Sequence, residues 1–147
     1  MEDEQPSQSI APTEGANTSS TPFRVLLVED DRSVRRYLEV TLQRSGYQVI
    51  AASDGLEAMK LALSTEIHAV VTDAIMPHLR GQQLAAFLRN NPKLASIPII
   101  LLTGQENKRN ATSHDNLIDS FLYKPVQAQE LLKCLKKLLT QSQDREQ

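Results

Sequence analysis

The sequence predicts an α/β fold in which a doubly wound parallel sheet of five strands lies between two layers of helices. Five short runs rich in Val, Ile, Leu and Phe are bounded by polar or turn residues, which is typical of strands buried on both faces. Segments with apolar residues at helical spacing alternate with these runs, and the connections are short. This alternation indicates parallel strands joined by right-handed crossovers through helices.

The first two strands are expected at residues 23–29 and 47–52. The helix between them should end at Gly46, because glycine suits the position just past a helix. Asp54 can cap the next helix, with Glu57 three residues later as in a capping box. The inward positions are expected to be Val34, Leu38, Thr41 and Leu42 on the first helix, and Leu56, Met59 and Leu63 on the second.

The second half of the chain continues the pattern. The third strand is expected at 68–72, and a loop with Pro77 and Gly81 leads to a helix whose inner face carries Leu84, Phe87 and Leu88. The fourth strand, at 97–103, tolerates Pro98 because a proline at a strand start is compatible with the ladder. Residues 105–116 are polar and hold three asparagines, Asn107, Asn110 and Asn116, so the helical pattern is poorest there. A fifth strand at 119–124 and an amphipathic helix at 127–140 complete the domain.

Charge is distributed unevenly along the chain. Residues 1–22 hold four acidic residues and no Lys or Arg, so they contribute −4 to the net charge of −2, and the other 125 residues contribute +2. Ile10 is the only large aliphatic residue between Met1 and residue 22, too little to offset the entropy of ordering the stretch. We interpret residues 1–22 as a disordered acidic tail, 23–140 as one domain and 141–147 as a short polar tail.

The composition excludes several classes of protein. No apolar run approaches the roughly 20 residues that cross a bilayer, and the start of the chain lacks the basic and apolar segments of a secretory signal. Cys134 is the only cysteine, which excludes an internal disulfide and fits a reducing compartment. With six aromatic residues and no basic stripe, binding to nucleic acid has no support. We therefore expect a cytoplasmic protein that binds neither nucleic acid nor membrane.

Polar residues that suit phosphate and metal chemistry stand where the predicted strands end. Ligands of open α/β sheets bind at the carboxyl ends of the strands, so these side chains should surround one site. Asp31 is better placed to cap the first helix, and capping is the preferred interpretation of this residue. The candidates are Glu29, Asp30 and Asp31 after the first strand, Asp73 after the third, Thr103 after the fourth and Lys124 after the fifth.

From residue 23 to about residue 140, the chain resembles the receiver domains of response regulators, the phosphoacceptor modules of two-component signalling. The resemblance rests on the acidic pair Glu29 and Asp30, the D-x-x-M-P-x-x-x-G run that starts at Asp73, Thr103, and the Lys124-Pro125 pair. It implies a flavodoxin-like fold with strand order 2-1-3-4-5. In that order the first and third strands are neighbours, which brings Asp30 and Asp73 into one cluster.

The resemblance also implies how phosphorylation proceeds. Asp73 would accept a phosphoryl group from the phosphohistidine of a histidine kinase or a histidine phosphotransfer protein. Carboxylates in one pocket repel one another, and Mg²⁺ suits such an all-oxygen site. Asp30 and Asp73 would bind Mg²⁺ directly, Glu29 largely through water, and Ile75 through its backbone carbonyl. No enzymatic activity is expected beyond the protein's own phosphorylation and dephosphorylation.

The same resemblance implies a signalling switch. Thr103 and Lys124 would contact the phosphoryl oxygens, as phosphoryl transfer depends mainly on alignment and charge neutralisation. Thr103 and Phe121 would form the switch that changes the surface presented to an unknown downstream protein. The Lys124-Pro125 peptide bond is expected to be cis, as is typical of the family.

Three other interpretations are weighed against this one. A metal-dependent phosphatase usually needs an acid/base aspartate two residues after the nucleophile, where this chain has Ile75. A flavin or dinucleotide protein would need glycines in the first βα turn, which reads EDDRSV. A pseudo-receiver would bind partners without phosphorylation, and the complete set of site residues argues against it.

The chain departs from the receiver pattern before the fifth strand. Leu117 and Ile118 stand where receivers commonly carry Gly and Ala, and the preceding residues 105–116 form a poor helix. This leaves the downstream partner open without affecting the site. Only about seven polar residues follow the last helix, so we expect a stand-alone receiver without an output domain.

Overall fold

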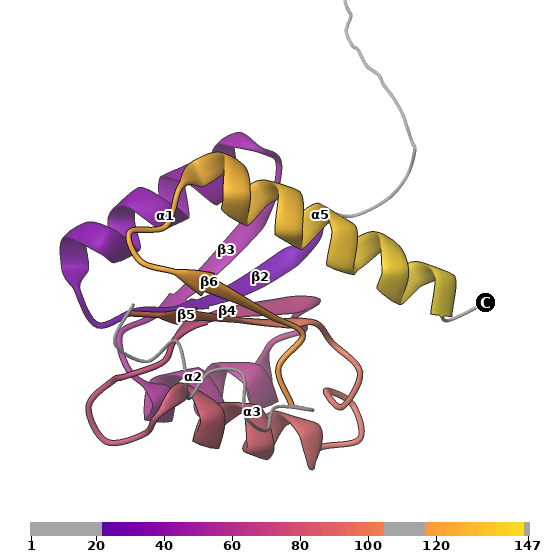
Figure 1. The fold of residues 1–147 in the computed structure, drawn as a ribbon. Coiled ribbons are helices and arrows are strands. Elements are labelled where there is room, and N and C mark those ends of the chain that lie inside the picture. Colours follow the sequence, from indigo (N-terminus) through magenta and orange to yellow (C-terminus); the bar gives the residue numbers. More distant parts are fainter. Residues whose placement is uncertain (1–21, 105–116, 146–147) are drawn as a thin grey trace, which may run out of the picture.

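The computed structural model describes residues 22–104 and 117–145, and it has the predicted α/β architecture (Figure 1). One five-stranded sheet has the order β3-β2-β4-β5-β6, which is 2-1-3-4-5 in chain order. Every pairing in the sheet is parallel. The fold class is therefore confirmed. The strands are β2 (Arg24–Val28), β3 (Gln48–Ala52), β4 (Ala69–Asp73), β5 (Ile99–Thr103) and β6 (Ser120–Tyr123).

Helices cover both faces of the sheet (Figure 1). One face is covered by α1 (Arg32–Arg44) and α5 (Ala128–Arg145), and the other by α2 (Gly55–Ser64) and α3 (Gly81–Arg89). Neighbouring strand residues point to opposite faces, so each strand contributes to two separate cores. From β2, Leu27 packs with the α1 and α5 side and Leu26 with the α2 and α3 side. Every residue of the central strands β4 and β5 is buried, which explains their almost continuous apolar sequences.

The predicted helix ends are confirmed. Asp31 caps α1 by accepting a hydrogen bond from the Val34 backbone N–H at 3.0 Å. Asp54 caps α2 by accepting one from the Glu57 N–H at 2.8 Å. Gly46 follows α1 with a φ of 95°, a left-handed conformation that glycine adopts at little energetic cost.

The inner face of α2 differs in part from the predicted one: Met59 packs against the core as predicted, but the two leucines do not. The buried residues are Gly55, Ala58 and Ala62, whereas Leu56 is 48% and Leu63 61% exposed. Small residues on one stripe let the helix lie close to its neighbours: a Cβ atom added at Gly55 would lie 2.6 Å from the Leu79 side chain. The prediction that the leucines face inward was wrong because close packing, and not side-chain size, orients this helix.

The boundaries of the other elements shift slightly. Most strands are one or two residues shorter than predicted, and Asp73 is the last residue of β4 and does not follow it. Pro98 lies just before β5, where its carbonyl still accepts a hydrogen bond from the Val70 N–H. Helix α5 continues to Arg145, beyond the predicted end at residue 140.

Some predictions fall outside the part of the chain that the structure describes. These are the acidic tail up to residue 21 and the helix predicted at 105–116. Among the described residues, no helix is both long and apolar enough to cross a membrane.

Candidate functional site

The carboxyl ends of β2 and β4, which are neighbours in the sheet, bring three carboxylates together. Glu29 and Asp30 directly follow β2, and Asp73 ends β4. Each residue offers one carboxylate oxygen, and the three oxygens lie within 4.8 Å of one another. Glu29 and Asp73 are buried while Asp30 is exposed. The acidic cluster Glu29, Asp30 and Asp73 is therefore open to solvent on the side of Asp30.

Lys124 extends from the end of β6 into the acidic cluster. Its ammonium nitrogen Nζ lies 2.9 Å from Asp73 Oδ1 and 3.2 Å from Glu29 Oε1. Burial lowers the pKa of Lys124, but its hydrogen bond to Asp73 and the two neighbouring negative charges outweigh burial and raise this pKa above its usual value. Lys124 is therefore a fixed positive charge beside Asp73.

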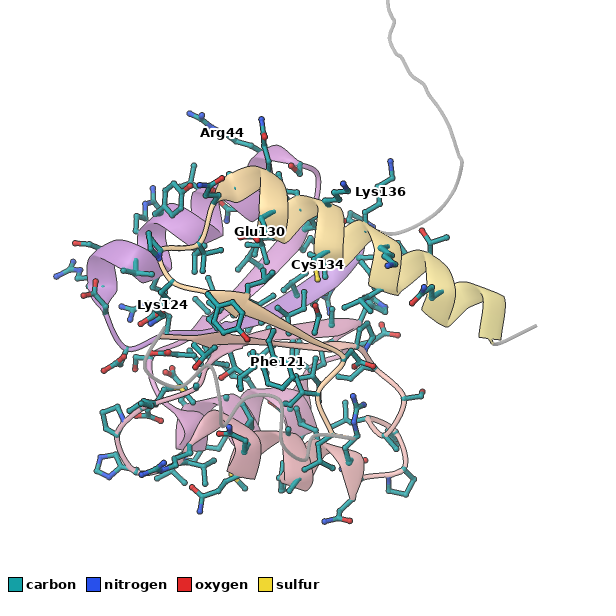
Figure 2. All side chains as sticks on the ribbon, viewed as in Figure 1. Arg44, Phe121, Lys124, Glu130, Cys134 and Lys136 are labelled. Carbon is teal, nitrogen blue, oxygen red and sulfur yellow. The ribbon has the colours of Figure 1, made fainter. Side chains whose placement is uncertain are left out.

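The backbone around Lys124 is held in place. Its N–H donates a hydrogen bond to the Thr103 carbonyl at 2.8 Å, and the Lys124-Pro125 peptide bond is cis, as predicted. Figure 2 shows Lys124 at the end of the sheet where α1 begins.

Glu29 is a buried carboxylate whose bonding is incomplete. Only 1% of the residue is exposed, and its Oε2 atom accepts a hydrogen bond from the Asp31 N–H at 3.1 Å. In the described part of the chain its Oε1 atom has the ion pair with Lys124 but no hydrogen bond of good geometry. Burial is the main cause that raises the pKa of Glu29; the Asp73 charge adds to it, and the Asp31 N–H and Lys124 oppose it.

The donors of the acidic cluster fit Mg²⁺. The three carboxylates supply hard oxygen ligands, and the ammonium group of Lys124 balances only part of their negative charge. The buried Oε1 atom of Glu29 retains an unused acceptor position facing this cluster. A small divalent cation that retains water molecules would satisfy both the charge and the open side of the cluster.

The conformation of the loop after β4 explains why the D-x-x-M-P-x-x-x-G run ends in a glycine, Gly81. The Gly81 N–H donates a hydrogen bond to the Ala74 carbonyl at 2.9 Å, which folds the loop back on the end of the strand. A Cβ atom at Gly81 would lie 2.6 Å from the backbone carbonyl oxygen of Asp73. Gly81 thus permits a close backbone approach directly behind Asp73. Within the same loop Met76 is buried, whereas Ile75 is 54% exposed.

The predicted switch residues lie on one face of the sheet. Thr103, 2% exposed, ends β5, and the register places it one residue beyond Leu102, the partner of Asp73. Phe121 is opposite Leu101 in the ladder between β5 and β6. Since alternate residues share a face, Thr103 lies on the same face as Leu101. Phe121 is partly buried against the core on that face, which is the face that α2 and α3 cover (Figure 2 labels Phe121).

Arg35, a residue that the sequence analysis did not identify, contacts the acidic loop. Its Nη1 atom donates hydrogen bonds to the backbone carbonyls of Glu29 at 2.8 Å and Asp30 at 3.5 Å. The available signal was its position on the first turns of a helix that starts just after the acidic pair, since helical side chains lean toward the helix N-terminus.

An apolar pocket of about 530 Å³ opens beside Lys124. It lies between α1 and the segment that follows β6, so it adjoins the acidic cluster through Lys124. The pocket is lined by Val34, Tyr37, Leu38, Gly104, Lys124, Pro125 and Val126.

Comparison with known proteins agrees with this geometry. Residues 25–136 match the family described as the response regulator receiver domain. The response regulator MprA of Mycobacterium sp. (strain KMS) is 37% identical over 119 residues, which are 80% of this chain and 51% of MprA. The protein PilG of Pseudomonas aeruginosa is 30% identical over 118 residues, which are 80% of this chain and 87% of PilG. The chain thus spans about half the length of MprA and most of PilG.

Solved structures show the same fold. The chemotaxis response regulator CheY4 of Vibrio cholerae has a TM-score of 0.75 and 29% identity, with 80% of this chain and 99% of CheY4 covered. The signal receiver domain of a signal transduction histidine kinase from Syntrophus aciditrophicus has a TM-score of 0.74 and 30% identity, covering 80% of this chain and 90% of that domain.

Proposed function

Because this chain belongs to the response regulator receiver domain family, we propose that it accepts a phosphoryl group onto Asp73 in a Mg²⁺-dependent reaction and signals through a changed surface. One observation carries the proposal: the ammonium of Lys124 is paired with the buried Asp73 and Glu29, beside the open carboxylate of Asp30. This arrangement gives Asp73 a cation on one side and leaves the cluster accessible on another.

Asp73 is suited to act as the nucleophile because an ionised carboxylate needs no general base. One of its oxygens attacks the phosphorus of a phosphohistidine, so that an O–P bond forms as the P–N bond breaks. The histidine ring leaves with the electron pair of the P–N bond, as a neutral imidazole when its other nitrogen carries a proton. The product is an acyl phosphate, and Lys124 and the hydroxyl of Thr103 would bind its oxygens; the pairing of Lys124 with Asp73 supports this role for Lys124.

Glu29, Asp30 and Asp73 would hold Mg²⁺, together with the backbone carbonyl of Ile75. When bound, the cation neutralises negative charge on the carboxylates and the phosphoryl oxygens. Glu29 supports this assignment because its buried Oε1 atom lacks a hydrogen bond among the described residues.

The phosphoryl group would signal through Thr103 and Phe121. It adds about −1.5 to −2 charges and new acceptor oxygens next to Asp73. We expect Thr103 to move toward these oxygens and Phe121 to turn into the space released, because packed cores prefer discrete states. The shared face of these two residues supports this route.

The donor would be a histidine kinase or a histidine phosphotransfer protein in the cytoplasm. The apolar pocket beside Lys124, with the half-exposed Tyr37 at its wall, offers such a protein a surface next to Asp73. A downstream protein of unknown identity would read the changed surface.

The metal requirement can be tested with a matched pair of variants. The protein is incubated with a small phosphodonor, with Mg²⁺ or with a chelator, and labelling is followed by intact mass. Asp30→Asn should slow labelling and weaken Mg²⁺ binding because a ligand is lost, whereas Asp31→Asn changes a neighbouring carboxylate that only caps α1. Labelling that proceeds equally with a chelator would contradict the metal requirement. A complete absence of labelling would contradict the proposal and favour a pseudo-receiver. Continuous hydrolysis of the donor would favour a phosphatase.

A further inference from the structure

We propose that Arg35 is a positioning residue for the Mg²⁺ site: its guanidinium holds the backbone of Glu29 and Asp30 so that their carboxylates converge on Asp73. This inference rests on the proposed function, because it concerns the cation that the acidic cluster would bind.

The side chains of Glu29 and Asp73 have direct partners. Lys124 pairs with both, and the Asp31 N–H donates to Glu29. The Asp30 side chain is different: it is exposed, and among the described residues it makes no hydrogen bond or ion pair. The position of its carboxylate therefore depends on the backbone from which it extends.

Arg35 is the side chain that bonds to this backbone. Its Nη1 atom donates to the Glu29 carbonyl at 2.8 Å and to the Asp30 carbonyl at 3.5 Å, and these two carbonyls lie beyond the last ladder pair of β2 with β4. A hydrogen bond from a charged donor is shorter and stronger than a neutral one, so the contact at 2.8 Å fixes the peptide between the two ligand residues. Groups that hold metal ligands in this way orient the ligands without touching the metal.

A purely electrostatic role would have the opposite effect on metal affinity. Arg35 carries a positive charge close to the acidic loop, and by charge alone it repels a bound cation. Its removal should then tighten Mg²⁺ binding. If Arg35 positions the ligands, its removal should weaken binding instead. The direction of the change separates the two roles.

Arg36 provides a matched control. It is the next residue on α1, its side chain is 72% exposed, and its contact is a long ion pair with Glu39 at 3.7 Å. Arg36→Gln removes the same charge from the same helix without touching the acidic loop.

The test measures Mg²⁺ dissociation constants of the parent protein, R35Q, R35K and R36Q by titration followed through amide NMR shifts. We expect R35Q to bind Mg²⁺ about tenfold more weakly than R36Q, as is found when outer partners of metal ligands are removed. R35K should also bind more weakly than the parent, because a single ammonium on a shorter stem keeps the charge but not the planar fork. At saturating Mg²⁺ the labelling rate of R35Q should approach that of R36Q, which a general loss of structure would not allow.

Binding by R35Q as tight as or tighter than that of R36Q would overturn the role of Arg35. Should R35Q fail to fold, R35K decides in its place, and unchanged affinity in R35K would overturn the role. If the parent protein does not bind Mg²⁺, the proposed function itself is overturned. This result is distinct from a failure of the Arg35 role, because it is seen in the parent protein without any variant.

Discussion

Glu29 and Lys124 show at the residue scale how burial and charge compete in this site. Burial disfavours the charged form of both, but the outcome differs: the pKa of Glu29 is raised because burial dominates, and the pKa of Lys124 is raised because its two carboxylate partners outweigh burial. Glu29 is thus more readily protonated than an exposed glutamate. Lys124 keeps its charge throughout the neutral range.

Stability of the metal-free protein should therefore depend on Glu29 in a defined pH window. A raised pKa stabilises the folded state below the unfolded value of 4.5, and this contribution is lost as pH rises through the higher folded pKa. The contribution of Lys124 is lost only above its unfolded value of 10.5, outside this window. The glutamine side chain of the Glu29→Gln variant cannot titrate. The free energy of unfolding of this variant, relative to that of the parent, should therefore be higher at about pH 8 than at about pH 5.

The measurement is urea unfolding in the presence of a chelator at both pH values. Glu130→Gln, the same substitution on the exposed surface of α5, serves as the control and should show no such change. If the free energies of unfolding of the parent and of Glu29→Gln differ by the same amount at both pH values, the pKa of Glu29 is not raised by folding.

The site residues were predictable because strand ends can be recognised from where apolar runs stop. Glu29, Asp73 and Lys124 were identified in this way, and the structure brings them together. The burial of Glu29 beside the exposed Asp30 was not predictable, because it depends on how the chain leaves β2. Arg35 was missed because its partners are backbone carbonyls, so that only its position on the first turns of α1 pointed to the contact.

At the scale of elements, two glycines hold helices and loops close to their neighbours. Gly55 lets α2 approach Leu79, and Gly81 lets the start of α3 approach the backbone of Asp73. The close contact between Gly55 and Leu79 also explains why the inner face of α2 was not predicted from the positions of its large leucine side chains. The alternation pattern recognises an amphipathic helix, but small residues can turn its leucines toward solvent.

Gly81→Ala should impair the site as well as stability. The new Cβ atom would meet the Asp73 carbonyl oxygen at 2.6 Å, and backbone cannot move aside as a side chain can. We expect a loss of about 1–3 kcal/mol in the free energy of unfolding, together with weaker Mg²⁺ binding. Gly55→Ala meets the Leu79 side chain, which is not part of the acidic cluster, and should lower stability without changing Mg²⁺ affinity. Unfolding and Mg²⁺ titrations of both variants provide the comparison, and equal Mg²⁺ affinities would contradict this account.

At the scale of the whole molecule, the proposed signalling route would connect the end of β4 with β6. Strand order makes this route short, because β5 alone separates the two strands and carries Thr103. The strand order was predictable from the resemblance to receiver domains, whereas the partner was not. Partner choice depends on surface residues, and this chain spans only about half the length of MprA.

Phe121→Ala should separate labelling from signalling. The side chain packs against the core on the face of the sheet that α2 and α3 cover, and it is not part of the acidic cluster, so Mg²⁺-dependent labelling should be nearly intact. The amide NMR shifts that phosphorylation causes in β6 and at the start of α5 should become smaller, because the aromatic ring can no longer occupy the space left by Thr103. Phosphorylation shifts of the same size with and without Phe121 would exclude this residue from the switch.

The central claim is that Asp73 is the phosphoacceptor, and site mapping after reaction with a small phosphodonor tests it most directly. In the presence of Mg²⁺ the intact mass should increase by one phosphoryl group, and peptide mapping should place that group on Asp73. Asp73→Asn should remain unlabelled because a neutral amide is a poor nucleophile. Stoichiometric labelling of Asp73→Asn, or a phosphoryl group mapped to another residue of the parent protein, would contradict the account.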